Sequence, residues 1–149
     1  MARFEWKRLR LIPVVFVSVF VFAVIDYAIR GPQARHKQIE IEEKLSSIPD
    51  LKSAKVVNSS SGFKTGGGYA RRILEADVLP DQIDSYYRQQ LEQRGWFFLK
   101  KEVRLSKARV IFCSKKGDQV AMIELPESVR TTPYKYTLAL NWGIDCRLQ

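Results

Sequence analysis

The residues with the most reactive chemistry in this chain are Cys113, Cys146 and His36, which are its two cysteines and its one histidine. A thiol acts as a nucleophile or a metal ligand when a nearby base or cation lowers its pKa. His36 lies far from both cysteines in the sequence, within a charged segment. Two cysteines and one histidine are too few ligands for a zinc site. We therefore expect no catalytic residue, no metal site and no cofactor.

The two cysteines are instead expected to form a disulfide bond. Cys113 lies near the end of a predicted strand, and Cys146 follows the last predicted strand. Disulfides persist in oxidising compartments, so this expectation depends on export of the chain. The alternative is two free thiols, one of them buried in the sheet.

Three other patterns look like chemical sites, but structural roles explain them. The glycine-rich segment 65–68 lacks the Gly-Lys-Ser/Thr ending of a phosphate loop, and it leads into a predicted strand. Asp77, Asp81 and Asp84 surround a predicted helix start, where backbone N–H groups favour negative charge. The serines at 59–61 have no base close to them in the sequence. No set of nucleophile, base and orienting group can be assembled from these residues.

Basic residues are the main surface feature that the sequence predicts. The chain has a formal net charge of +9, and the basic surplus persists after the first 26 residues. We predict one binding surface, basic except for a tryptophan, made of Arg71, Arg72, Lys100, Arg104, Arg109, Lys115, Lys116 and Trp142. A charged outer sheet face without any partner is the alternative interpretation.

The C-terminal half alternates between strand and helix signals. Alternating apolar residues follow Tyr69, and Pro80 and Asp81 suit the start of a helix that ends before Gly95. Further strands are predicted at 96–105, 108–114, 119–125 and 134–142, with Gly117 in a hairpin turn. The expected fold class is α+β: a single N-terminal transmembrane helix, then a small domain with an antiparallel sheet of about four or five strands packed on one main helix.

An apolar segment near the N-terminus predicts a membrane anchor. Residues 11–25 contain no charged residue and, if Asp26 near the end is allowed, the apolar stretch continues to Ile29. A basic cluster precedes it, formed by Arg3, Lys7, Arg8 and Arg10, and this cluster favours a cytoplasmic N-terminus. A signal peptide cleaved after Ala23 is the competing interpretation. Both place the domain outside the cytoplasm.

The expected organisation has three parts. Residues 1–30 form the anchor, which Gly31 and Pro32 end sharply. Residues 31–68 form a juxtamembrane stalk and a flexible loop, because the stretch 58–68 is polar and rich in Gly and Ser. Residues 69–149 form the α+β domain.

These features predict a non-catalytic, membrane-anchored extracytoplasmic binding module. It would act as an accessory subunit of an envelope complex or as an immunity-type protein that neutralises a toxin. We expect a bacterial inner membrane location with a periplasmic domain, contact with the bilayer through residues 11–29, a protein partner in the envelope, and no nucleic acid. The alternatives are a small envelope enzyme or regulatory domain with an unrecognised site, and a domain that binds anionic lipid.

Overall fold

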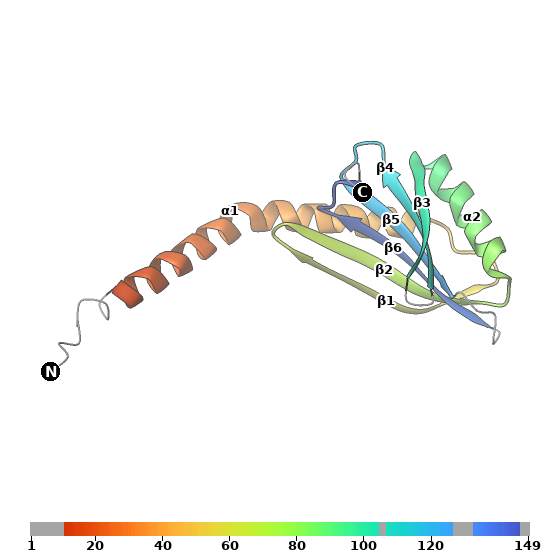
Figure 1. The fold of residues 1–149 in the computed structure, drawn as a ribbon, viewed down its shortest axis with the longest axis horizontal. Coiled ribbons are helices and arrows are strands. Elements are labelled where there is room, and N and C mark those ends of the chain that lie inside the picture. Colours follow the sequence, from red (N-terminus) through yellow and green to blue (C-terminus); the bar gives the residue numbers. More distant parts are fainter. Residues whose placement is uncertain (1–10, 105–106, 127–132, 147–149) are drawn as a thin grey trace.

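The computed structural model describes residues 11–104, 107–126 and 133–146 of the chain. A long N-terminal helix comes first, a second helix follows the first two strands, and four strands complete the fold (Figure 1). The elements are α1 (Leu11–Ser47), β1 (Ala54–Lys64), β2 (Gly67–Ala76), α2 (Pro80–Gln93), β3 (Trp96–Arg104), β4 (Lys107–Ser114), β5 (Gln119–Pro126) and β6 (Tyr134–Trp142). The basic cluster predicted to precede the anchor lies outside the described residues.

All described strands form one antiparallel sheet in the order β1-β2-β6-β5-β4-β3. The last strand, β6, therefore lies between β2 and β5, and the two edges of the sheet are β1 and β3. The α+β class and the antiparallel sheet are confirmed. The strand number is six, which is higher than predicted, because β1 was not recognised in the sequence.

Both helices contribute to the main core. Ile41 and Leu45 of α1, and Ile48 just after it, are buried together with Ile83, Tyr87 and Leu91 of α2. They pack against alternate residues of the central strands, among them Leu74, Phe112, Ile123, Leu138 and Leu140. The period of two along a strand puts these side chains on one face of the sheet. The second half of α1 is thus a core helix of the domain, in addition to the one main helix that was expected.

A smaller apolar cluster lies on the opposite face of the sheet. Ile111 and Val120 are buried there beside Cys113 and Cys146. Cys113 and Cys146 form a disulfide bond with their Cα atoms 5.9 Å apart, which confirms the predicted pairing. The bond holds the segment after β6 over this end of the sheet.

Helix α1 does not end at Gly31 and Pro32 as the sequence suggested. It continues through Pro32 to Ser47, and Figure 1 shows that it bends along its length. Proline removes one backbone donor and crowds the preceding turn, so Pro32 accounts for a bend within the helix. Within the part of the chain that the structure describes, no helix is long and apolar enough to cross a membrane. The expected transmembrane helix is therefore not confirmed.

Residues 58–68 are ordered strand and turn, and the structure differs here from the flexible loop that was expected. They belong to a long hairpin in which Asn58 pairs with Ile73 and Lys64 pairs with Gly67. One of the glycines that suggested flexibility, Gly68, makes room for close contacts. A Cβ atom on Gly68 would lie 2.5 Å from both the Gln38 Oε1 and Trp142 Nε1 atoms. Residues 31–68 therefore contribute a helix and two strands to the same packed unit.

Candidate functional site: a basic cleft beside helix α1

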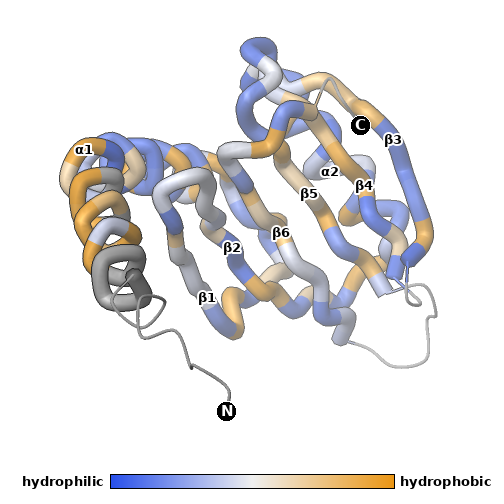
Figure 2. Tube along the Cα trace, turned by 60° about the vertical axis from the view of Figure 1, so that its left-hand side comes forward, coloured by the Kyte–Doolittle hydropathy of each residue, from blue (hydrophilic) through white to orange (hydrophobic). Residues whose placement is uncertain are grey.

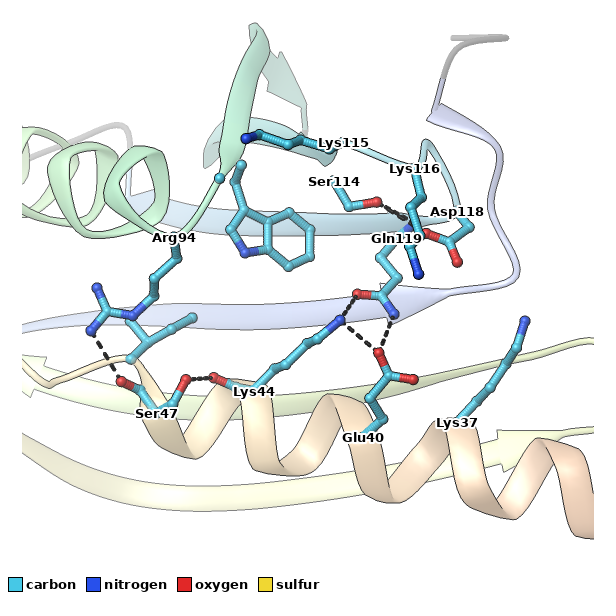
Figure 3. A pocket seen from close by; sticks show the side chains of 13 residues that line it. Lys37, Glu40, Lys44, Ser47, Arg94, Ser114, Lys115, Lys116, Asp118 and Gln119 are labelled. Atoms are coloured by element: carbon cyan, nitrogen blue, oxygen red, sulfur yellow. Dashed lines mark hydrogen bonds and ion pairs between the residues drawn. The ribbon is translucent and has the colours of Figure 1, made fainter.

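A cleft of about 450 Å³ lies between α1, the start of β3 and the turn that joins β4 to β5 (Figure 3). Seven of the side chains around it carry charge: the cations are Lys37, Lys44, Arg94, Lys115 and Lys116, and the carboxylates are Glu40 and Asp118. Ile48 and Trp96 form an apolar part of the wall. The cleft therefore combines a positive rim with a small apolar surface.

Two glycines shape the loops that form this cleft. Gly95 follows α2 with a φ of 81°, so the chain reverses directly into Trp96 of β3. Gly117 has a φ of 78° in the β4–β5 turn, and this turn holds Lys115 and Lys116 at the edge of the cleft. The sequence predicted that Gly95 would end a helix and that Gly117 would lie in a hairpin turn.

A polar triad closes one side of the cleft. The Lys44 Nζ atom lies 2.6 Å from the Glu40 Oε1 atom and donates to the Gln119 Oε1 atom at 2.9 Å. The side-chain amide of Gln119 donates in turn to Glu40 at 3.4 Å. The hydrogen bond from Lys44 is the main reason that the pKa of Glu40 lies below its usual value, and the charge of Lys116 adds to this effect. Glu40 is therefore a fixed negative charge and a poor general acid.

The other cations of the cleft make different contacts. Arg94 donates to backbone oxygens of Gln90 and Ser47 at 2.9 and 3.2 Å. Lys37 lies over the indole ring of Trp142, with its Nζ atom 5.6 Å from the ring centroid. Lys115 and Lys116 are exposed on their turn. An acidic group that enters the cleft would meet these cations at its rim.

The structure divides the predicted binding surface into separate parts. Lys100, Arg104 and Arg109 do lie on one face of the β3–β4 pair, with Arg71 of β2 on the same side of the sheet. Acidic side chains alternate with them, because Lys100 pairs with Glu102 at 3.3 Å and Arg109 pairs with Glu124 at 2.6 Å. This face therefore has mixed charge.

The remaining predicted residues lie elsewhere. Arg72 points to the helix face, where it pairs with Asp50 at 3.0 Å and donates to the carbonyl oxygens of Leu45 and Ile48 at the end of α1 and just after it. Trp142 is buried on the same face. Lys115 and Lys116 belong to the basic cleft, so only these two of the predicted surface residues line it.

The α1 residues of the cleft were missed by the sequence analysis, which treated their segment as a stalk. A signal for them exists: Lys37, Glu40, Lys44 and Ile48 recur at intervals of three and four, which places them on one face of a helix. Arg94, which follows α2, was also not among the predicted surface residues. Nothing local in the sequence indicates that these residues face the β4–β5 turn.

The two serine hydroxyls of the cleft already donate hydrogen bonds within the chain. The Ser47 and Ser114 hydroxyls donate to the Lys44 carbonyl oxygen at 2.7 Å and to the Asp118 carboxylate at 3.1 Å. In the described part of the chain, no three His, Cys, Asp or Glu side chains lie close enough to hold a metal ion.

No family model, no curated protein and no solved structure matches this chain.

Proposed function

We propose that this chain is a non-catalytic, membrane-anchored binding module that presents the basic cleft to an acidic segment of a protein partner in the cell envelope. Residues 11–29 would insert into the bilayer, with the N-terminus in the cytoplasm of a bacterium and the folded domain in the periplasm. The partner would be a subunit of an envelope complex or an imported toxin.

The observation that carries the proposal is the contrast between the two halves of α1. The second half is buried in the domain core, whereas the first half extends away from the domain (Figures 1 and 2). Its large apolar side chains are between 46% and 73% exposed: Val17, Val19, Phe20, Val21, Phe22, Val24, Ile25, Tyr27 and Ile29. Apolar surface of this extent, all around a helix, favours burial in another medium.

The length of the segment supports insertion. The sequence has no charged residue from Leu11 to Ile25. Nineteen helical residues, from 11 to 29, extend about 28 Å, close to the ~30 Å hydrocarbon thickness of a bilayer. The disulfide bond supports an oxidising compartment such as the periplasm.

The basic cleft supports an acidic partner. Several cations surround a concave surface that has two carboxylates, one of which is already paired with Lys44. Complementary charge accelerates association and selects among partners, and this effect weakens as salt screens it. The apolar wall at Trp96 and Ile48 would contact the uncharged part of the bound segment.

The first test is topology. A reporter fused to the C-terminus and protease treatment of intact and opened cells would locate the domain. We expect full-length chain in the membrane fraction, with the domain protected until the outer membrane is opened. A C-terminal domain that stays protected after the periplasm is opened would reject the proposed orientation, and loss of about 23 residues would show cleavage in place of anchoring.

The second test is charge reversal in the cleft. Crosslinking in membranes should recover a partner with the unsubstituted chain, and the K115E/K116E variant should reduce its recovery at least tenfold. The matched control is K52E/K55E, which makes the same change of net charge at exposed residues before and within β1. Equal losses in both variants, or no loss in either, would reject the cleft as the binding site.

A further inference from the structure

A groove of about 470 Å³ lies where the exposed half of α1 meets the domain. One wall is a face of α1 that includes Tyr27, Pro32, Arg35 and Ile39, and the other wall is Phe63 at the end of β1. Figure 1 shows the tip of the β1–β2 hairpin beside α1, next to the bend of the helix. Two segments that are distant in sequence therefore form this groove.

The groove is lined with exposed apolar side chains. Tyr27 is 68% exposed, Ile39 is 48% exposed and Phe63 is 42% exposed. Burial of apolar surface is worth about 25 cal/mol per Å², so three such side chains in one groove favour an apolar occupant. Phe63 points toward α1, because its Cβ atom lies beside the position that a Gly68 side chain would occupy on the helix face of the sheet.

This groove is continuous with the apolar surface of the projecting helix. That surface extends from Val17 to Ile29, and the groove begins at Tyr27 within it. The medium that covers the projecting helix therefore lies next to the groove. Aromatic side chains such as Tyr27 and Phe63 are favoured at the headgroup level of a bilayer, where they contact both lipid chains and water.

The charge of the groove also fits a phospholipid. Arg35 lines it, Lys64 is exposed at the adjacent hairpin tip, and the residues that line it include no carboxylate. A lipid phosphate would accept hydrogen bonds from the Arg35 guanidinium while its acyl chain packs on Ile39 and Phe63. Basic residues next to an anionic membrane surface add to such binding.

We infer that the groove is a second membrane contact, occupied by a bilayer phospholipid, which seats the hairpin tip on the membrane surface. The inference rests on the proposed function, because lipid reaches the groove only if α1 inserts into the bilayer. Two contacts restrict rotation of the domain about α1, whereas one helix alone leaves the domain free to rotate. The hairpin tip thus fixes which side of the domain faces the membrane.

The test uses the full-length chain reconstituted into phospholipid vesicles that carry a nitroxide quencher on the lipid headgroup. The F63W variant places an indole at the hairpin tip. The control variant is V103W, which places an indole at a residue that is 61% exposed on β3, the opposite edge of the sheet. The signal is the fluorescence of each variant after subtraction of the unsubstituted chain, which contains three tryptophans.

We expect the labelled lipid to reduce the added F63W emission at least twofold and to leave the V103W emission unchanged. If both variants bind vesicles and are quenched equally, the inference is overturned, but the proposed membrane anchor is not. F63W emission that is shielded from iodide in solution but not quenched by the lipid would indicate a second copy of the chain in the groove, which also overturns it. Chain that does not sediment with vesicles would overturn the proposed function together with the inference.

Discussion

The indole N–H of Trp142 donates a hydrogen bond to the Gln38 Oε1 atom at 3.2 Å, so the last strand is joined to the first helix. The amide nitrogen of Gln38 donates to the Tyr69 carbonyl oxygen of β2 at 2.9 Å. Both side chains are buried, and buried polar groups that are satisfied in this way specify one arrangement of helix and sheet. This contact connects the projecting helix to the centre of the domain.

Gly68 is predicted to be essential for this contact. A G68A Cβ atom would overlap Gln38, Trp142 and the Phe63 Cβ atom, all within 2.8 Å. We expect the substitution to lower the free energy of unfolding by about 1–3 kcal/mol, as overpacking does in well-packed interiors. Urea unfolding of the full-length chain in detergent micelles measures the change. G66A is the matched control, since a Cβ atom there has nothing within 4 Å, and an equal loss in both variants would contradict the argument.

Arg72 and its neighbour Arg71 are predicted to differ strongly in their contribution to stability. Arg72 pairs with Asp50 and donates to the Leu45 and Ile48 carbonyl oxygens, so it joins the end of α1 to the sheet. R72M should lower the free energy of unfolding by about 2–4 kcal/mol, because Asp50 and the carbonyl groups lose a charged partner. R71M should cost less than about 1 kcal/mol, because Arg71 is exposed and donates only to Ser60. Similar unfolding midpoints for the two variants would refute the assignment.

The disulfide bond is predicted to stabilise the domain. Cys113 and Cys146 are 33 residues apart, and the chain-entropy model gives ~3–4 kcal/mol for a loop of this length. We expect the C113A/C146A variant to unfold at lower urea concentration than the unsubstituted chain. Reductant should shift the unsubstituted chain by a similar amount and leave the variant unchanged. A variant that still responds to reductant would show that the effect comes from another source.

The buried tyrosine pair is predicted to make stability depend on alkaline pH. The hydroxyls of Tyr87 and Tyr136 lie 3.1 Å apart, and burial raises the pKa of both above the usual 10.0. The folded state thus keeps these protons more tightly than the unfolded chain does. Their contribution is fully present below pH 10 and is lost as the pH rises beyond it.

Substitution of one tyrosine tests this dependence. Y136F should cost about 1 kcal/mol at neutral pH through the lost hydrogen bond, and it should make the decline between pH 9 and 11 shallower. Unfolding midpoints across that range provide the measurement. The control is Y69F at an exposed position, and it should retain the slope of the unsubstituted chain. An unchanged slope in Y136F would show that the pair does not govern the alkaline limit.

The sequence predicted the elements whose own residues define them. Helix α2 was recognised because Pro80 begins it, Gly95 follows it, and Ile83, Tyr87 and Leu91 recur on one face. Strand β6 was recognised because apolar residues alternate along it, and β4 and β5 were recognised because they flank the turn at Gly117. The disulfide was predicted from the positions of the two cysteines at the ends of predicted strands and from the expected compartment.

Strand β1 and the second half of α1 were not recognised as parts of the domain. Strand β1 is an edge strand with mostly exposed polar side chains, so backbone pairing with β2 stabilises it and no apolar pattern marks it. The candidate site was missed for a related reason. The cleft combines Lys44, Arg94 and Gln119, and only the packing of α1 against the sheet brings them together.

The sequence by itself determined the α+β class, the positions of α2 and of the C-terminal strands, and the presence of one long apolar segment near the N-terminus. Helix and strand propensity and the periodicity of apolar residues depend on residues that are close in the sequence, so a single sequence reveals them. Only the tertiary structure decided that α1 continues into the core, that β6 lies between β2 and β5, and which basic side chains share a cleft. These outcomes depend on contacts between residues as far apart in the sequence as Gln38 and Trp142. The energies of such contacts cannot be inferred from a local sequence pattern.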